Sequence, residues 1–177
     1  AKYYVSGLKI DEAIERIKKD NLFQYPTERQ VSRLARACYK RLDALGNDQL
    51  VHELASAPNE IAKQINLYAV MRYNRLVWEF MIQVIGEKYR NQDMNFSRKD
   101  MNAFFSRLQA QDDSVAAWSD ATITKIKSVL VRMLIETGYL DGLKDTTLNP
   151  VFLCEELERG IEANNDYDAL SAFNYFR

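Results

Sequence analysis

Residues 118–138 read WSDATITKIKSVLVRMLIETG, and this stretch decides the fold because it encodes one complete helix with both ends marked. Ser119 is a suitable N-cap, since its hydroxyl can accept a hydrogen bond from a free backbone N–H of the first turn. Asp120 follows at the positive end of the helix dipole, and Gly138 supplies a left-handed exit. The sequence therefore predicts a helix from Ser119 to Thr137.

Two faces of this predicted helix carry different chemistry. Apolar side chains recur at helical spacing and are expected to face a core: Ile123, Ile126, Leu130, Met133 and Leu134. Polar and cationic side chains lie on another side: Lys125, Ser128 and Arg132, with Lys127 beside them. A cationic edge next to a buried face is typical of a recognition helix. A solvated surface helix has the same pattern, and periodicity alone does not separate the two.

The N-terminal part of the chain repeats this design. Residues 9–20 are predicted to form a first helix, and Thr27, which has capping-box spacing to Gln30, begins a second helix that ends near Gly46. The second helix is expected to bury Val31, Leu34, Cys38, Leu42 and Leu45. Its basic residues recur three or four apart on another face: Arg29, Arg33, Arg36 and Lys40. A helix, a short connector and a longer basic helix follow the order of a helix-turn-helix.

Residues 60–89 are predicted to form one long central helix, because apolar residues cover nearly its whole circumference. Ser97 and Asp100 mark the start of a further helix, which with residues 119–137 makes a second helix-turn-helix-like unit. Residues 138–153 suit either the β-hairpin wing of a winged helix or a plain loop. The expected fold class is mainly α, with two helix-turn-helix-like units around the central helix. The expected segments are an N-terminal lobe at 1–58, the central helix at 59–92, and a C-terminal lobe with an acidic tail at 93–177.

Length and composition favour a helical globular protein. Hydrophobic residues make up 47% of the 177 residues, while only three prolines and six glycines interrupt the chain. The most apolar run, residues 65–85, contains Arg72, Arg75 and Glu79, each of which is costly in hydrocarbon, so no membrane partner is expected. Two distant cysteines and the absence of a signal-peptide pattern favour a reduced, cytoplasmic protein.

The formal net charge of −1 hides an uneven distribution. Residues 1–45 carry a net charge of +4, residues 46–71 of −2, residues 72–132 of +3 and residues 133–177 of −6. Two basic regions and an acidic end suit a protein that meets phosphate on one surface and a different partner on another. Random scatter on a solvated surface is the alternative for balances of this size.

The sequence lacks the residue patterns of the common enzyme classes. His52 is the only histidine, and no glycine-rich phosphate loop, paired-cysteine motif, or nuclease or deaminase carboxylate pattern is present. Glu155, Glu156 and Glu158 could bind a cation weakly, but a solvated acidic face explains them as well. The protein is therefore expected to have no catalytic activity, no cofactor, no metal and no small-molecule substrate.

Four segments, found in order along the chain, resemble the BrxA family of bacteriophage-exclusion (BREX) defence systems. They are Asn21 to Gln24 before the basic helix, Ile65 to Met71, Met101 to Phe105, and Trp118 to Leu140. None of them is a catalytic signature, so the specificity of the match lies in their number and order. The resemblance implies a mostly helical, DNA-associated accessory protein. It also implies other BREX proteins as partners, in a complex that marks host DNA and blocks phage replication.

The resemblance favours double-stranded DNA as a partner of the basic residues. Arginine forks suit phosphate or a guanine edge, and lysines suit phosphate. The expected DNA-binding residues are Arg29, Arg33, Arg36, Lys40, Lys125, Lys127, Ser128 and Arg132. The alternative function is that of a protein–protein adaptor in the same complex. Its expected anchors are the aromatic side chains at the C-terminal end: Tyr167, Phe173, Tyr175 and Phe176.

Overall fold

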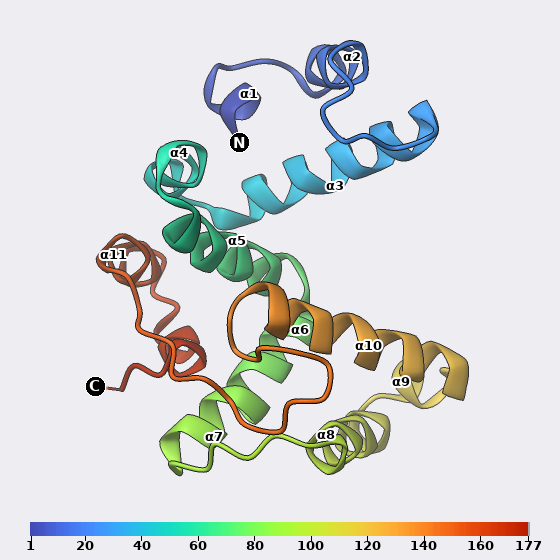
Figure 1. The fold of residues 1–177 in the computed structure, drawn as a ribbon, viewed down its shortest axis with the longest axis vertical. Helices are drawn as coiled ribbons and strands as arrows, with labels where there is room; N and C mark the ends of the chain where they lie inside the picture. Colours follow the sequence, from blue (N-terminus) through green and yellow to red (C-terminus); the bar gives the residue numbers. More distant parts are fainter. Residues whose placement is uncertain (177) are drawn as a thin grey trace. The chain divides into compact units, whose positions relative to one another are not determined.

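A computed structural model describes residues 1–176, and it is mainly α-helical, as the sequence predicts (Figure 1). Within these residues no segment forms a β-strand, and the only β-type pairing is an isolated antiparallel bridge between Asn95 and Thr147. Arg177, the last residue of the expected C-terminal segment, lies outside the described residues.

The described chain packs as two compact units. Unit 1 consists of residues 1–75 and 154–165, and unit 2 consists of residues 76–153 and 166–177. The helices of unit 1 are α1 (Lys2–Val5), α2 (Ile10–Lys19), α3 (Glu28–Leu45), α4 (Asp48–Ser56), α5 (Asn59–Tyr73) and α11 (Glu155–Ala163). Those of unit 2 are α6 (Arg75–Phe80, which starts at the junction), the π-helix η1 (Met81–Gly86), α7 (Glu87–Arg90), α8 (Arg98–Gln111), α9 (Asp113–Ala116), α10 (Asp120–Glu136) and the 3₁₀-helix η2 (Tyr167–Phe173).

Unit 1 is built around α5, against which α3, α4 and α11 pack. The side-chain amide of Asn164 donates to the Leu45 carbonyl at 2.8 Å and to the Tyr68 hydroxyl at 3.0 Å, so it ties the end of α11 to α3 and α5. Gly160 of α11 lies so close to Leu50 of α4 that a side chain at this position would overlap it. The segment after residue 153 therefore completes the core of the N-terminal unit.

The predicted helix ends are confirmed where a cap residue marks them. The hydroxyl oxygen of Ser119 accepts from the Thr122 N–H at 3.2 Å, and Gly138 has a φ of +83° just beyond α10. Thr27 caps α3 in the same way, and Gly46 ends that helix with a φ of +59°. These caps satisfy backbone groups that have no partner inside the helix.

Two residues of α3 that were predicted to face inward do not do so. Leu34 is only half-buried, and Cys38 is exposed. The reason is that α3 uses two separate packing surfaces: Val31 and Ala35 are buried against α2, while Leu42 and Leu45 are buried nearer the C-terminal end. Cys38 lies between these surfaces, where neither neighbour covers it.

The prediction of one continuous helix over residues 60–89 is wrong. The backbone leaves the helical conformation at Asn74, with φ −131° and ψ 107°, and helical structure resumes at Arg75. Residues 81–86 then form a π-helix, in which each backbone hydrogen bond spans five residues and not four. The apolar pattern correctly indicates burial, but burial alone does not require a straight helix.

The core of unit 2 forms around η1, which packs against η2 and α8. The hydroxyl of the fully buried Tyr139 donates to the Ala172 carbonyl at 2.9 Å, and that of Tyr89 donates to the Asn149 carbonyl at 2.6 Å. The Phe80 and Phe104 rings meet edge to face, with centroids 5.5 Å apart. Hydrogen-bonded tyrosines and packed phenylalanines thus connect the helices with the long loop at 138–153.

Of the two alternatives for residues 138–153, the structure shows the loop and not the β-hairpin wing. Part of its backbone pairs with residues 94–96: the Leu148 N–H donates to the Met94 carbonyl at 2.7 Å, and the Phe96 N–H donates to the Thr146 carbonyl at 2.8 Å. Within the segment, the Asn149 N–H donates to the Tyr139 carbonyl at 2.9 Å. These bonds, together with the bridge at Asn95, satisfy the polar groups that a hairpin would have satisfied.

We predict that Gly86→Ala destabilises the protein, because a Cβ atom at this position would lie 2.5 Å from the Ser171 hydroxyl oxygen and 3.2 Å from the Ser171 backbone carbon. Overpacking of this kind costs about 1–3 kcal/mol. Urea unfolding measures the effect. The control is Gly142→Ala, also in unit 2, where the nearest atom would be 3.7 Å away. Equal stability of the two variants would contradict the close packing of η1 on η2.

Candidate nucleic-acid interface

The first candidate surface lies on α3, whose orientation is fixed by α2. Ile14 and Ile17 of α2 form a buried cluster with Val31 and Ala35 of α3. Phe23, in the connector between the two helices, packs against the same cluster. The connector is thereby held in place, and the opposite face of α3 stays exposed, although Arg36 reaches from it to Asp11 of α2.

The four basic residues predicted on α3 are all exposed on this opposite face: Arg29, Arg33, Arg36 and Lys40. Their spacing of four, three and four residues keeps them within a narrow stripe of the helix. Arg36 forms an ion pair with Asp11 of α2, at 2.7 Å. The other three have no ion-pair partner among residues 1–176. The stripe, which we call the α3 row, therefore offers uncompensated positive charge to solvent.

The second candidate surface lies on α10 and is smaller. Lys125 and Arg132 are exposed and have no ion-pair partner within the described part of the chain, while Ser128 bonds to the Thr124 carbonyl of its own helix. Lys127 differs from them, since its ammonium donates to the Asn102 side chain at 2.7 Å and lies 5.3 Å from the Phe105 ring centroid. Lys127 thus ties α10 to α8, which leaves the other three as the outward group.

The aromatic residues predicted as partner anchors separate into two groups. Tyr167 and Phe176 are 51% and 43% exposed, and Tyr175 is half-buried. Phe173 is 1% exposed and belongs to the core of unit 2, so it offers no surface to a partner in this conformation. The Arg90 guanidinium lies 5.6 Å from the Phe176 ring centroid, which holds that ring against α7.

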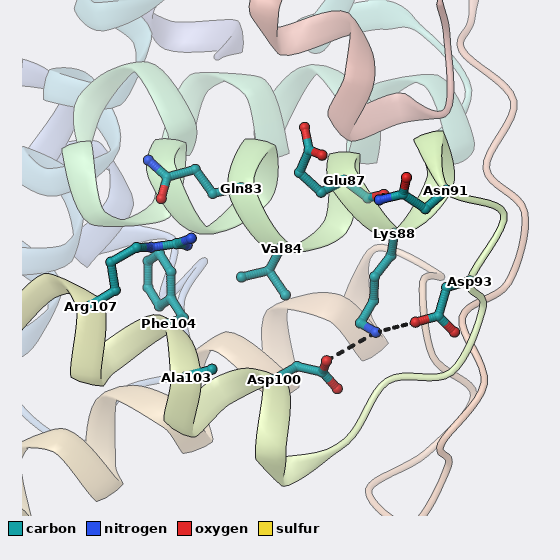
Figure 2. Close-up of a pocket in the computed structure, with 10 residues that line it drawn as sticks. All are labelled: Gln83, Val84, Glu87, Lys88, Asn91, Asp93, Asp100, Ala103, Phe104 and Arg107. Atoms are coloured by element: carbon teal, nitrogen blue, oxygen red, sulfur yellow. Dashed lines mark hydrogen bonds and ion pairs between the residues drawn. The ribbon is translucent and has the colours of Figure 1, made fainter.

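A pocket of about 220 Å³ lies in unit 2 between η1, α7 and α8. Figure 2 shows the Lys88 ammonium between the carboxylates of Asp93 and Asp100, at 2.9 and 3.0 Å. Burial lowers the pKa of Lys88, but the two hydrogen bonds outweigh it and raise this pKa above its usual value. Because both carboxylates already neutralise this cation, Lys88 is not available to bind a phosphate. Lys88 instead clamps the connector between α7 and α8.

The same clamp shifts the two carboxyl groups. The hydrogen bond from Lys88 is the main cause of the lowered pKa of Asp93. Burial opposes ionisation of Asp100, but hydrogen bonds from Lys88 and from the Ser97 N–H outweigh it and lower that pKa too. Ser97 and Asp100 form the capping box that the sequence predicts at the start of α8.

The residues that could support catalysis do not gather in one place. His52 is exposed on α4, and burial raises the pKa of the Cys154 thiol, which disfavours the reactive thiolate. Among residues 1–176, no three side chains of histidine, cysteine, aspartate or glutamate lie where they could share a metal ion. None of the described helices combines the length and apolar character that a membrane span requires.

Sequence reasoning missed one feature of unit 1, a groove beside the α3 row. It is lined in part by Tyr4 and Tyr39, whose ring centroids are 5.3 Å apart. The Tyr4 hydroxyl donates to Asp43 at 2.6 Å, and this hydrogen bond raises the pKa of Tyr4 to about 12. The two tyrosines are far apart in the sequence, so only the fold brings them together, and no local pattern could have revealed the groove.

The model of the BrxA family matches residues 1–165. The chain belongs to the BrxA family. A relative from Bacillus cereus (strain H3081.97), named BREX protein BrxA, is 37% identical over 78% of this chain and 68% of its own length. A relative of the same name from Escherichia coli O9:H4 (strain HS) is 25% identical over 89% of this chain and 73% of its own length.

The fold also matches a solved structure, that of an uncharacterized protein from Magnetospirillum magneticum. The TM-score is 0.80, with 97% of this chain and 87% of the other covered, at 21% sequence identity. This likeness shows that this chain shares its fold with that protein.

The lowered pKa values of Asp93 and Asp100 make stability depend on pH. Stability that comes from ionised carboxylates is complete above the ordinary aspartate pKa and is lost as the pH falls through the lowered values. We predict that Lys88→Met lowers the free energy of unfolding at pH 7 and also weakens its decline on acidification below about pH 4. Urea unfolding at several pH values measures both effects.

The matched control for this prediction is Lys99→Met, since Lys99 is exposed on α8 and has no ion-pair partner among the described residues. It should leave both the stability and its acid dependence unchanged. If Lys88→Met and Lys99→Met showed the same acid dependence, Lys88 would not be the source of the shifted pKa values.

Proposed function

We propose that the protein is a non-catalytic, double-stranded-DNA-binding component of a BREX phage-defence system and acts in the cytoplasm. The relatives that carry the name BREX protein BrxA support the BREX role. The single observation that carries the DNA-binding role is the α3 row. Arg29, Arg33 and Lys40 present positive charge there without an ion-pair partner among residues 1–176.

The chemistry of the row suits the phosphate backbone of DNA more than a particular base sequence. Exposed cations a turn apart can each meet a phosphate, and phosphate contacts fix the position of a protein without reading sequence. Duplex DNA is therefore expected to bind with little sequence preference. Purified protein and labelled duplexes of unrelated sequence test this by fluorescence anisotropy. Absence of binding at low salt would overturn the proposal.

The row also leads to a prediction about individual residues. Arg29→Gln with Arg33→Gln should weaken duplex binding and lower the slope of log affinity against log salt by about 2, one for each lost phosphate contact. Arg36 is left unchanged because its replacement would break the ion pair with Asp11 and disturb the packing of α2 on α3. Anisotropy titrations at several salt concentrations measure both effects.

The control for the α3 row is Lys63→Gln on α5 in the same unit. Lys63 forms an ion pair with Glu60 at 3.1 Å, so it is not expected to contribute to DNA binding. A control variant that loses as much affinity as the double variant would show that total charge, and not the α3 row, determines binding.

The α10 group leads to a separate prediction. Lys125→Glu with Arg132→Glu should weaken duplex binding, and combining this pair with the α3 variants should weaken it further, if both groups contact DNA. Each variant is checked for folding by its thermal melting curve. Affinity unchanged by the α10 pair in a folded protein would mean that α10 serves packing or a partner protein, and that the α3 row acts without it.

The second candidate function, a protein–protein adaptor, rests on the exposed rings of Tyr167 and Phe176 in unit 2. Aromatic side chains of this kind often dominate binding energy at protein interfaces. Tyr167→Ala with Phe176→Ala would then abolish co-purification with other BREX proteins and leave duplex binding intact. The two functions are compatible, because they use different surfaces of the chain.

A further inference from the structure

The groove beside the α3 row has the form of a ligand site. Its volume is about 590 Å³, within the usual range for small-molecule sites, and it lies between residues 4–11 and the second half of α3. The aromatic and charged residues of the lining are Tyr4, Lys9, Asp11, Arg36, Tyr39, Lys40 and Asp43. Two of these, Arg36 and Lys40, also belong to the α3 row, so the groove and the row are continuous.

The two tyrosine rings give the groove an aromatic wall. The rings are inclined at 57°, and both are half-buried, so part of each remains open. Both hydroxyls are held by hydrogen bonds to other residues of the lining: Tyr4 donates to Asp43 at 2.6 Å, and Tyr39 donates to the Leu8 carbonyl at 3.3 Å. The rings are therefore held in place before a ligand arrives, which lowers the entropy cost of binding. Rings presented in this way bind nucleobases by stacking.

Some charged side chains of the groove have a partner, and others do not. Of its two carboxylates, Asp11 forms an ion pair with Arg36 at 2.7 Å, whereas Asp43 accepts a hydrogen bond from the neutral Tyr4 hydroxyl and keeps its negative charge. Lys9 and Lys40 have no ion-pair partner within the described residues and are exposed. The charge left for a ligand is therefore positive. A suitable ligand has a flat aromatic ring, which stacks on the tyrosine rings, and a negative group, which pairs with the lysines. A nucleotide has both.

We propose that this groove binds an unpaired nucleotide of DNA, as found at a single-stranded end, with the base stacked on the tyrosine wall and the phosphate near Lys9 and Lys40. The choice of DNA over a free nucleotide rests on the proposed function, because the α3 row would hold a duplex directly beside the groove. The protein would then prefer DNA with an unpaired end over a blunt duplex.

The test compares the affinity of the whole protein for a blunt duplex and for the same duplex with a short 3′ overhang, by fluorescence anisotropy. The protein should bind the overhang about tenfold more tightly, as expected for one stacked base. Tyr39→Leu should remove this preference and leave affinity for the blunt duplex unchanged. The control is Tyr25→Leu, since Tyr25 is a 48% exposed tyrosine of the same unit that does not line the groove. It should keep the preference.

Lys9→Gln provides a second variant, because it removes a cation of the groove and leaves both rings and their hydrogen bonds in place. It should reduce the preference for the overhang, so the test stands even if Tyr39→Leu does not fold. Equal affinity of the unaltered protein for both DNAs would overturn the proposal. Retention of the preference in folded Tyr39→Leu or in Lys9→Gln would also overturn it.

If the proposed DNA-binding function is wrong, the same experiment gives a different result. If the protein binds neither DNA, the α3 row does not bind duplex DNA. The groove is then tested with a free nucleotide, 2-aminopurine 5′-monophosphate. The fluorescence emission of this nucleotide falls when its base stacks on an aromatic ring. Quenching that is lost in Tyr39→Leu and kept in Tyr25→Leu would support a nucleotide site without duplex binding. Absence of quenching would overturn the groove as well.

Discussion

Burial of one face of α3 is the constraint on which the proposed interface depends. Ile14 and Ile17 of α2 cover Val31 and Ala35, while Leu42 and Leu45 are buried further along the same helix. Each fully buried valine, leucine or isoleucine side chain contributes about 1.5–3 kcal/mol, which is large compared with the interactions of an exposed charge. The apolar side therefore decides how α3 lies, and the basic residues on the other side face solvent as a consequence. The positive stripe needs no attractive interaction of its own to be held in place.

Charged residues that are neighbours in the sequence do not all belong to the same unit of the structure. The acidic C-terminal end splits, because α11 packs in unit 1 and η2 packs in unit 2. Glu155, Glu156 and Glu158 stand in the first turn of α11, where negative charge is stabilised by the helix dipole. These glutamates thus have a local structural role, and the acidic end does not form one separate surface.

Helix ends and the fold class could be predicted from the sequence, because caps are local chemistry. Thr27, Ser97 and Ser119 each bond to backbone groups within three residues, so the information lies in the adjacent sequence. The break at Asn74 could not be predicted, since apolar residues recur at helical spacing on both sides of it, up to Met71 and again from Leu76. The pairing of residues 138–153 with residues 94–96 was equally hidden, because it depends on segments distant in the sequence. For the candidate site, spacing correctly placed the α3 row on an exposed face, but the bonds of Lys127 and the tyrosine groove arise only from tertiary contacts.

The central claim, that the outward face of α3 meets DNA, can be tested by cleavage from the two sides of this helix. At 100° per residue, Cys38 lies about 140° around the helix from Arg33, on a different side, and both are exposed. Two variants are made, both with Cys154→Ser. The first keeps Cys38, and the second carries Cys38→Ser together with Arg33→Cys. An iron chelate that generates hydroxyl radicals is attached to the single thiol of each variant. The account predicts strong cleavage of bound duplex DNA from position 33 and little from position 38. Equal cleavage from both positions, or stronger cleavage from position 38, would contradict it.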